Sequence, residues 1–127
     1  MSSTDAPGDV PSTALVVAMP RPPAQVQPFV DAFGPELTVT FLLTFGGSEI
    51  YVATDPKGRA EWHRFVGDIA AARLAAVAYR LPRRVPLANR WLAKMLAWQG
   101  FPQATIARRL RITDVAVRTA LRDPRVR

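Results

Sequence analysis

The side chains with the clearest chemical potential lie near the C-terminus, between Gln103 and Arg122. Arginine dominates this stretch, and its planar guanidinium group matches both phosphate oxygens and the O6/N7 edge of guanine. Threonine and glutamine can hydrogen-bond to phosphates or bases, and valine can contact the methyl group of thymine. The residues that could bind DNA in these ways are Gln103, Arg108, Arg109, Arg111, Thr113, Asp114, Val115, Arg118, Thr119 and Arg122.

Two short helices would have to position these side chains. Apolar residues recur at helical spacing over 103–110 and again over 114–122, which predicts one helix in each range. Thr113 could cap the second helix, and Asp114 in its first turn complements the helix dipole. The residues predicted to face inward are Ile106, Ala107, Leu110, Val117, Ala120 and Leu121.

This pair of helices resembles a helix-turn-helix unit, with an ordinary helical hairpin of the core as the alternative. Ala107 stands where two steeply crossing helices need a small side chain, and Ile112 is apolar where the unit closes its core. Arg111 departs from the usual glycine in the left-handed turn, at a cost of about 1 kcal/mol. A supporting helix is predicted over 87–99, with one stripe formed by Leu87, Trp91, Met95 and Trp98.

Docking as such units do would place the helix over 114–122 in the major groove of DNA. Arg118 would then read guanine, and Val115 would touch a thymine methyl group. Thr113 and Thr119 would reach phosphates or bases. The remaining contacts, to the DNA backbone, would come from Gln103 at the start of its helix and from Arg108, Arg109 and Arg111.

The charge of the chain is divided unevenly along its length. Residues 1–57 hold six acidic and two basic residues, a net charge of −4, whereas residues 58–127 hold four acidic and fifteen basic residues, a net charge of +11. A GC-rich genome would favour arginine over lysine, but it would not confine the positive charge to one part of the chain. The imbalance therefore indicates a polyanionic partner for the second part.

Four segments are predicted along the chain. Residues 1–23 contain five prolines among small polar residues and predict a flexible Pro-rich arm. Residues 24–80 form an N-terminal region, and residues 81–86 (Leu-Pro-Arg-Arg-Val-Pro) form a short, stiff, basic linker. Residues 87–127 form the helix-turn-helix domain.

Helical spacing is clear in two parts of the N-terminal region. One helix is predicted to run through Val26, Phe29 and Val30 and to end at Gly34. A second, amphipathic helix is predicted over 59–80, with an apolar face formed by Trp62, Phe65, Val66, Ile69, Ala72, Ala76 and Val77.

Residues 35–53 allow two interpretations. The threonine and valine content favours two strands joined at Gly46-Gly47 as a hairpin. A helix is also consistent, because Leu37, Phe41 and Phe45 would share one face, and Gly46-Gly47 would end it before a single strand over 49–53. The predicted fold class is therefore mainly α with one short β-strand or hairpin.

Two short motifs in this region, Phe45-Gly46-Gly47 and Ile50-Tyr51-Val52, followed by a helix-turn-helix unit, resemble the Mor transcription activator family of phage Mu-like elements. The likeness runs over about residues 30–125. This chain differs from the family in having Ala53-Thr54-Asp55-Pro56 where a proline follows the strand, and in the additional helix over 59–80.

The resemblance implies that residues 35–45 are helical and that residues 49–53 form a lone strand. A lone edge strand is unstable by itself, and in the family it pairs with its copy in a second subunit. The resemblance thus implies a homodimer, with an N-terminal dimerisation region over 24–80. The implied interface residues are Phe41, Phe45, Gly46, Gly47, Ile50, Tyr51 and Val52.

Several classes of function are disfavoured by composition. The chain has no cysteine, which excludes disulfide scaffolds, zinc ribbons and cysteine nucleophiles. His63 is the one histidine, and Glu61 would point away from it on a helix, so we expect no enzyme, no metal and no cofactor. The first residues lack the basic start of a secretory signal, and no apolar run is long enough to span a membrane. We expect a cytoplasmic protein that does not bind membranes.

The sequence therefore predicts a sequence-specific transcriptional regulator that binds double-stranded DNA, a phage-derived activator acting as a homodimer. Contact with RNA polymerase is implied by the resemblance alone. The alternative is a phage assembly or DNA-packaging factor, such as a small terminase-like DNA-recognition subunit. A third hypothesis is a protein-interaction module whose basic part binds an acidic partner.

Overall fold

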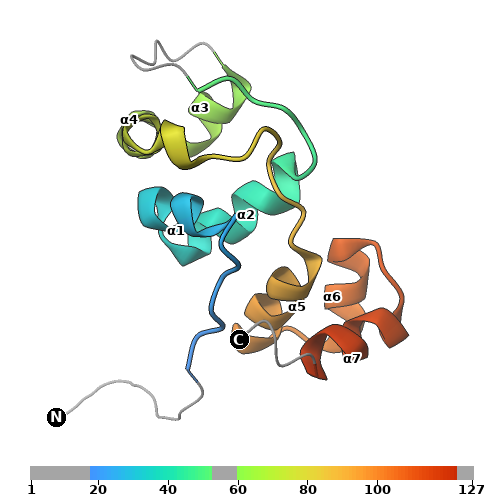
Figure 1. Cartoon of the computed structure of the whole chain (residues 1–127). Coiled ribbons are helices and arrows are strands. Elements are labelled where there is room, and N and C mark those ends of the chain that lie inside the picture. The colour runs from blue at the N-terminus through green and yellow to red at the C-terminus, as the bar shows by residue number, and fades with distance from the viewer. Residues whose placement is uncertain (1–17, 53–59, 123–127) are drawn as a thin grey trace, which may run out of the picture.

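The computed structural model describes residues 18–52 and 60–122, and the elements in these ranges are helices (Figure 1). This confirms the prediction of a mainly helical protein. In chain order the elements are α1 (Gln27–Phe33), α2 (Pro35–Phe45), α3 (Glu61–Val66), α4 (Asp68–Ala76), the 3-10 helix η1 (Ala78–Arg80), α5 (Asn89–Trp98), α6 (Gln103–Leu110) and α7 (Asp114–Arg122).

Helices α1 to α4 form one group, in which α1 packs against α2 and α4. Aromatic rings fill the contact between α1 and α2. The ring of Phe41 is central, with its centroid 5.7 Å from that of Phe29 and 5.0 Å from those of Phe33 and Phe45. Stacked and edge-on rings at such distances stabilise a core beyond the burial of their area.

Helix α2 resolves the ambiguity of residues 35–53, and the hairpin interpretation is wrong. Pro35 occupies the first turn, where its missing N–H costs nothing. The threonines that favoured a strand instead bond within the helix. The hydroxyl of Thr38 donates to the Gly34 carbonyl oxygen at 2.7 Å, and that of Thr44 donates to the Thr40 carbonyl oxygen at 2.9 Å. A helix can therefore accommodate these polar side chains.

The strand predicted over 49–53 is not formed in the described residues, and this prediction is corrected. Glu49 makes one isolated antiparallel bridge with Arg84. The Trp62 indole N–H donates to the Tyr51 carbonyl oxygen at 3.1 Å, so this oxygen bonds to a side chain rather than to the backbone of a neighbouring strand. Ala53 lies outside the described residues.

The single helix predicted over 59–80 is also corrected, because Gly67 divides it into α3 and α4. Gly67 has φ 90° and ψ 168°, a conformation that residues with a Cβ rarely adopt. The break changes which residues face the core. Ala71 and Leu74 are buried, whereas Ile69, assigned to the apolar face, is 73% exposed.

Helices α5, α6 and α7 form the second group, in which each helix packs against the other two (Figure 1). The predicted helices over 103–110 and 114–122 are confirmed with the same boundaries. Helix α5 is shorter than predicted. Trp91 and Met95 are buried as expected, but Leu87 and Trp98, at the ends of the predicted stripe, are 60% and 43% exposed.

The two groups share one connected cluster of buried apolar residues. Residues 18–23 were predicted as part of the arm, but they pack against the second group of helices. Pro20 is buried, and its carbonyl oxygen accepts a hydrogen bond from the indole N–H of Trp91 in α5 at 3.2 Å. Val85 in the linker is buried as well. Figure 1 shows α1 to α4 above α5 to α7, with the linker running between them.

Candidate nucleic-acid interface

The turn between α6 and α7 is a compact, left-handed cap. Arg111 has φ 58° and ψ 44°, the left-handed conformation that a helix-turn-helix unit predicts at this position. The N–H of Ile112 donates to the Ala107 carbonyl oxygen at 3.1 Å, and the N–H of Arg111 donates to the Arg108 carbonyl oxygen at 3.3 Å. These bonds satisfy carbonyl groups that the end of α6 would otherwise leave unpaired. The turn thereby fixes the direction in which α7 begins.

Helix α7 is capped by a side chain, as predicted. The hydroxyl oxygen of Thr113 accepts a hydrogen bond from the Ala116 N–H at 3.0 Å. Such a cap typically stabilises a helix by about 1 kcal/mol. The hydroxyl hydrogen of Thr113 stays available as a donor, so the same side chain can cap the helix and hydrogen-bond to an external oxygen.

One face of α7 is turned outward. Val117 and Ala120 are buried toward α5 and α6, whereas residues three and four positions apart on the other side are exposed. Val115 is 61% exposed, so its apolar side chain is open to an external contact. The outward face consists of Asp114, Val115, Arg118, Thr119 and Arg122.

All of the side chains predicted to bind DNA are exposed. Among the described residues, the guanidinium groups of Arg111, Arg118 and Arg122 have no hydrogen-bond or ion-pair partner. Gln103 begins α6 directly after Pro102, and no side chain caps that helix. The face thus presents unpaired cations, a hydroxyl-bearing residue and an apolar side chain, together with the carboxylate of Asp114 at the start of the helix.

Arg108 and Arg109 differ from these arginines because each contacts a neighbour. Arg108 Nη2 lies 3.5 Å from the Thr105 hydroxyl oxygen, a long and exposed contact. The guanidinium carbon of Arg109 lies 4.7 Å from the centre of the Phe101 ring. This cation–π contact holds Arg109 against the turn before α6 and leaves the edge of its guanidinium group for an anion.

A scan against protein-family models and searches of curated proteins and of solved structures gave no match to this chain. The resemblance to the Mor family therefore stays a prediction.

The residues of the implied dimer interface divide into two sets. Phe41 and Phe45 are buried inside this chain, 0% and 8% exposed, where they complete the aromatic core. Ile50 and Val52 line a hollow of about 200 Å³ together with other residues of the same chain. Tyr51 alternates with them and is 81% exposed.

The two glycines of this motif have a role within the chain. A Cβ on Gly46 would lie 2.6 Å from the Leu42 carbonyl oxygen and 3.3 Å from the Pro86 carbonyl oxygen. Gly47 has φ 87°, and its N–H donates to the Val85 carbonyl oxygen at 2.7 Å. The glycine pair thus ends α2 and lets the linker pass close to it.

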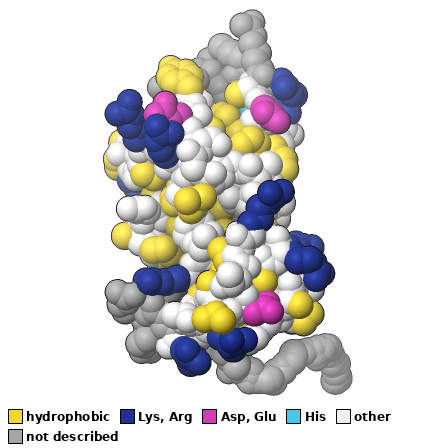
Figure 2. Space-filling view, turned by 90° about the vertical axis from the view of Figure 1, so that its right-hand side faces the viewer, with side chains coloured by type: hydrophobic (Ala, Val, Ile, Leu, Met, Phe, Trp, Pro, Cys, Tyr) yellow, Lys and Arg dark blue, Asp and Glu magenta, His cyan; other side chains and the backbone are white. Residues whose placement is uncertain are grey.

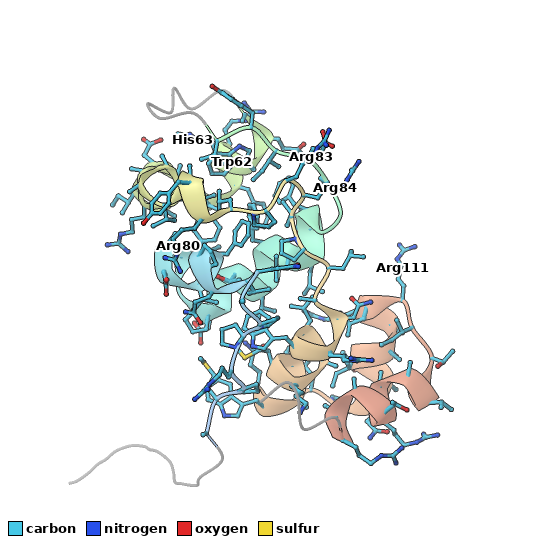
Figure 3. All side chains as sticks on the ribbon, in the orientation of Figure 1. Trp62, His63, Arg80, Arg83, Arg84 and Arg111 are labelled. Carbon is cyan, nitrogen blue, oxygen red and sulfur yellow. The ribbon has the colours of Figure 1, made fainter. Side chains whose placement is uncertain are left out.

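Arg83 and Arg84 lie in the basic linker and were not among the residues predicted to bind DNA. Both guanidinium groups contact the carboxylate of Glu49, at 3.5 Å from Arg83 and 3.2 Å from Arg84. Figure 3 shows both arginines extending toward the side of the molecule to which Arg111 also extends. On that face, Lys and Arg side chains are visible from the upper to the lower part of the molecule (Figure 2).

The one histidine contacts a carboxylate within the N-terminal group of helices. His63 is buried, and its Nε2 lies 2.8 Å from an Asp68 carboxylate oxygen, a contact that joins α3 to α4 across Gly67. Within residues 18–52 and 60–122, no group of three histidine, cysteine or acidic side chains is placed to hold a metal ion. In the same ranges, no helix has the length and apolar character needed to cross a membrane.

Proposed function

We propose that this protein is a sequence-specific DNA-binding regulator that places α7 in the major groove. The observation that supports this most directly is the outward face of α7. It carries the unpaired guanidinium of Arg118 beside the exposed Val115, on a short helix whose direction is fixed by a side-chain cap and a left-handed turn. Guanine recognition by arginine and thymine-methyl contact by valine are the interactions that such a face suits.

A homodimer reading a two-fold site is part of this proposal. One recognition helix of nine residues contacts few base pairs, so a second copy would extend the site and raise its specificity. Because Phe41 and Phe45 are buried in their own chain, pairing would use the exposed Tyr51. Sedimentation analysis of the wild type and of Tyr51→Asp tests this, and a purely monomeric wild type contradicts it.

The proposed function is tested by selecting binding sites from random duplex DNA and then comparing variants on the selected site. We expect Arg118→Ala to cost about 1–3 kcal/mol on that site and to relax the preference for one base pair. Arg73→Ala serves as the matched control, because Arg73 is an exposed arginine on α4, away from α6 and α7 (Figure 1).

Two outcomes would contradict the proposal. Failure to enrich any sequence would remove the claim of sequence specificity. An equal loss of affinity for Arg118→Ala on the selected and on scrambled DNA would show that Arg118 contacts phosphate rather than a base.

A further inference from the structure

The linker between the two helical groups carries a pair of arginines at fixed positions. Val85, the residue that follows them, is 2% exposed, and its N–H donates to the Ser48 carbonyl oxygen at 2.8 Å. The backbone of Arg84 also forms an isolated antiparallel β-bridge with that of Glu49. A proline on either side of this short segment restricts the backbone further. Arg83 and Arg84 are therefore held against the N-terminal group rather than carried on a free loop.

Both guanidinium groups are open to solvent. The side chain of Arg83 is 88% exposed and that of Arg84 is 63% exposed. They share the one carboxylate of Glu49, which cannot neutralise two cations, so the cluster keeps an excess of positive charge. Ion pairs as exposed as these are weak, and another anion can replace Glu49 at little cost.

The cluster lies on the side of the molecule toward which Arg111, one residue of the candidate interface, extends (Figure 3). Arg83, Arg84 and Arg111 extend toward that side in Figure 3, and the same face carries further basic side chains in Figure 2. A duplex docked on α7 is a long rod with about one phosphate charge per 1.7 Å of its axis. Such a duplex extends beyond the base pairs that α7 would read, so its flanking phosphates are available to basic groups elsewhere on the protein.

We propose that Arg83 and Arg84 bind backbone phosphates of the DNA that flanks the site read by α7. Glu49 orients the two side chains in the free protein, and phosphate replaces it in the complex. This inference rests on the proposed DNA binding and adds a second point of contact to it. Because phosphates carry no sequence information, the contact contributes affinity and register but no base preference.

The salt dependence of affinity tests this contact in the full-length protein. The slope of log K against log salt is about −0.9 for each phosphate contact on duplex DNA. We expect the double variant Arg83→Ala/Arg84→Ala to reduce the steepness of that slope by about 1.8, with equal loss on selected and scrambled duplexes. Glu49→Gln should tighten binding, since it removes the competing carboxylate. Arg73→Ala on α4 is the control and should leave the slope unchanged.

The outcomes separate this inference from the proposed function. If the slope of the double variant is unchanged while Arg118→Ala still relaxes base preference, the flanking contact is overturned and the proposed function stands. If the double variant fails to fold, Glu49→Gln decides, because unchanged or weaker binding overturns the contact. A wild type that binds no duplex at low salt overturns both.

Discussion

Arg111 combines an unfavourable backbone conformation with an exposed side chain. Its φ of 58° lies in the left-handed region, where a residue with a Cβ is less stable than glycine by about 1 kcal/mol. Ala88, just before α5, has the same conformation with φ 51°. The two positions therefore share a backbone cost, but only Arg111 carries a group that could bind phosphate.

Replacing each residue by glycine separates these two effects. We expect both Ala88→Gly and Arg111→Gly to raise the free energy of unfolding by up to about 1 kcal/mol, because each relieves the left-handed strain. Chemical denaturation measures this. Arg111→Gly should in addition weaken DNA binding and lower its salt slope by about 0.9, whereas Ala88→Gly should leave both unchanged.

The two glycine variants can contradict this account in different ways. Unchanged DNA affinity in a stabilised Arg111→Gly would remove Arg111 from the interface. Loss of stability in Ala88→Gly would show that the left-handed conformation is not a cost at that position.

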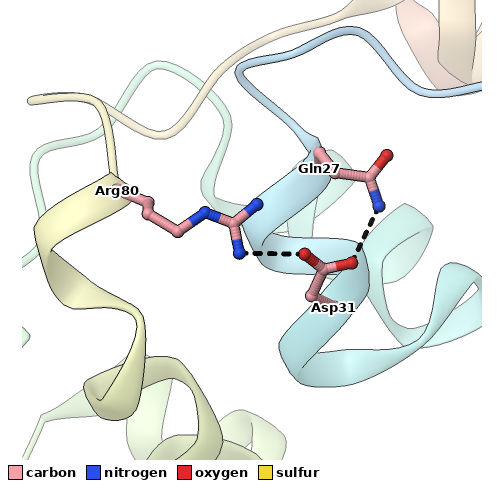
Figure 4. A network of polar contacts seen from close by, with 3 residues as sticks. All are labelled: Gln27, Asp31 and Arg80. Carbon is pink, nitrogen blue, oxygen red and sulfur yellow. Dashed lines mark hydrogen bonds and ion pairs between the residues drawn. The ribbon is translucent and has the colours of Figure 1, made fainter.

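Asp31 is the residue whose ionisation ties the first helix to η1. Hydrogen bonds from the Gln27 amide and from the Arg80 guanidinium lower the pKa of the Asp31 carboxyl (Figure 4). A pKa that is lower in the folded than in the unfolded protein means that the charged form stabilises the fold. This stabilisation is complete above the ordinary pKa of an aspartate and is lost as the pH falls through the lowered value.

We therefore expect Asp31→Asn to be less stable than the wild type at neutral pH and to approach it as the pH falls below about 4. Thermal unfolding of both proteins across this pH range measures the difference. A difference that stays constant from neutral to acid pH would show that the Asp31 charge is not what stabilises the contact.

At the scale of elements, prediction from the sequence was strongest where polar and apolar residues alternate at helical spacing. Helices α6 and α7 were predicted with their bounds and cap because those signals are local, whereas the left-handed turn at Arg111 was predicted from the resemblance to a helix-turn-helix unit. The break at Gly67 was missed because apolar residues continue on both sides of it at a spacing that suits one helix. The strand predicted over 49–53 could not be judged from local sequence, because the Tyr51 carbonyl oxygen accepts a hydrogen bond from the indole N–H of Trp62, eleven residues later.

Gly46 ends helix α2 and lies against the linker, so its substitution tests the packing of α2 against the linker. An added Cβ would lie 2.6 Å from the Leu42 carbonyl oxygen, and this backbone atom cannot rotate away. We expect Gly46→Ala to destabilise the protein by about 1–3 kcal/mol, as overpacking commonly does. Chemical denaturation measures the effect, and an unchanged midpoint would mean that α2 and the linker are not held together as described.

At the scale of the whole molecule, the basic residues of the range 58–127 lie in both groups of helices, because this range includes α3 and α4 as well as α5 to α7. The candidate interface could be predicted from sequence, because its residues lie within twenty positions of one another. The pair Arg83 and Arg84 could not be assigned in this way. Their relation to Glu49 and to the side occupied by Arg111 depends on how the linker folds back on α2.

The central claim, that α7 docks on DNA, is tested most directly by following backbone amide NMR signals of the full-length protein while duplex DNA carrying the selected site is added. We predict the largest changes at Val115, Arg118 and Thr119 on the outward face of α7, with α1 and α4 unaffected. No change at low salt, or changes concentrated in α1 and α4, would contradict the claim.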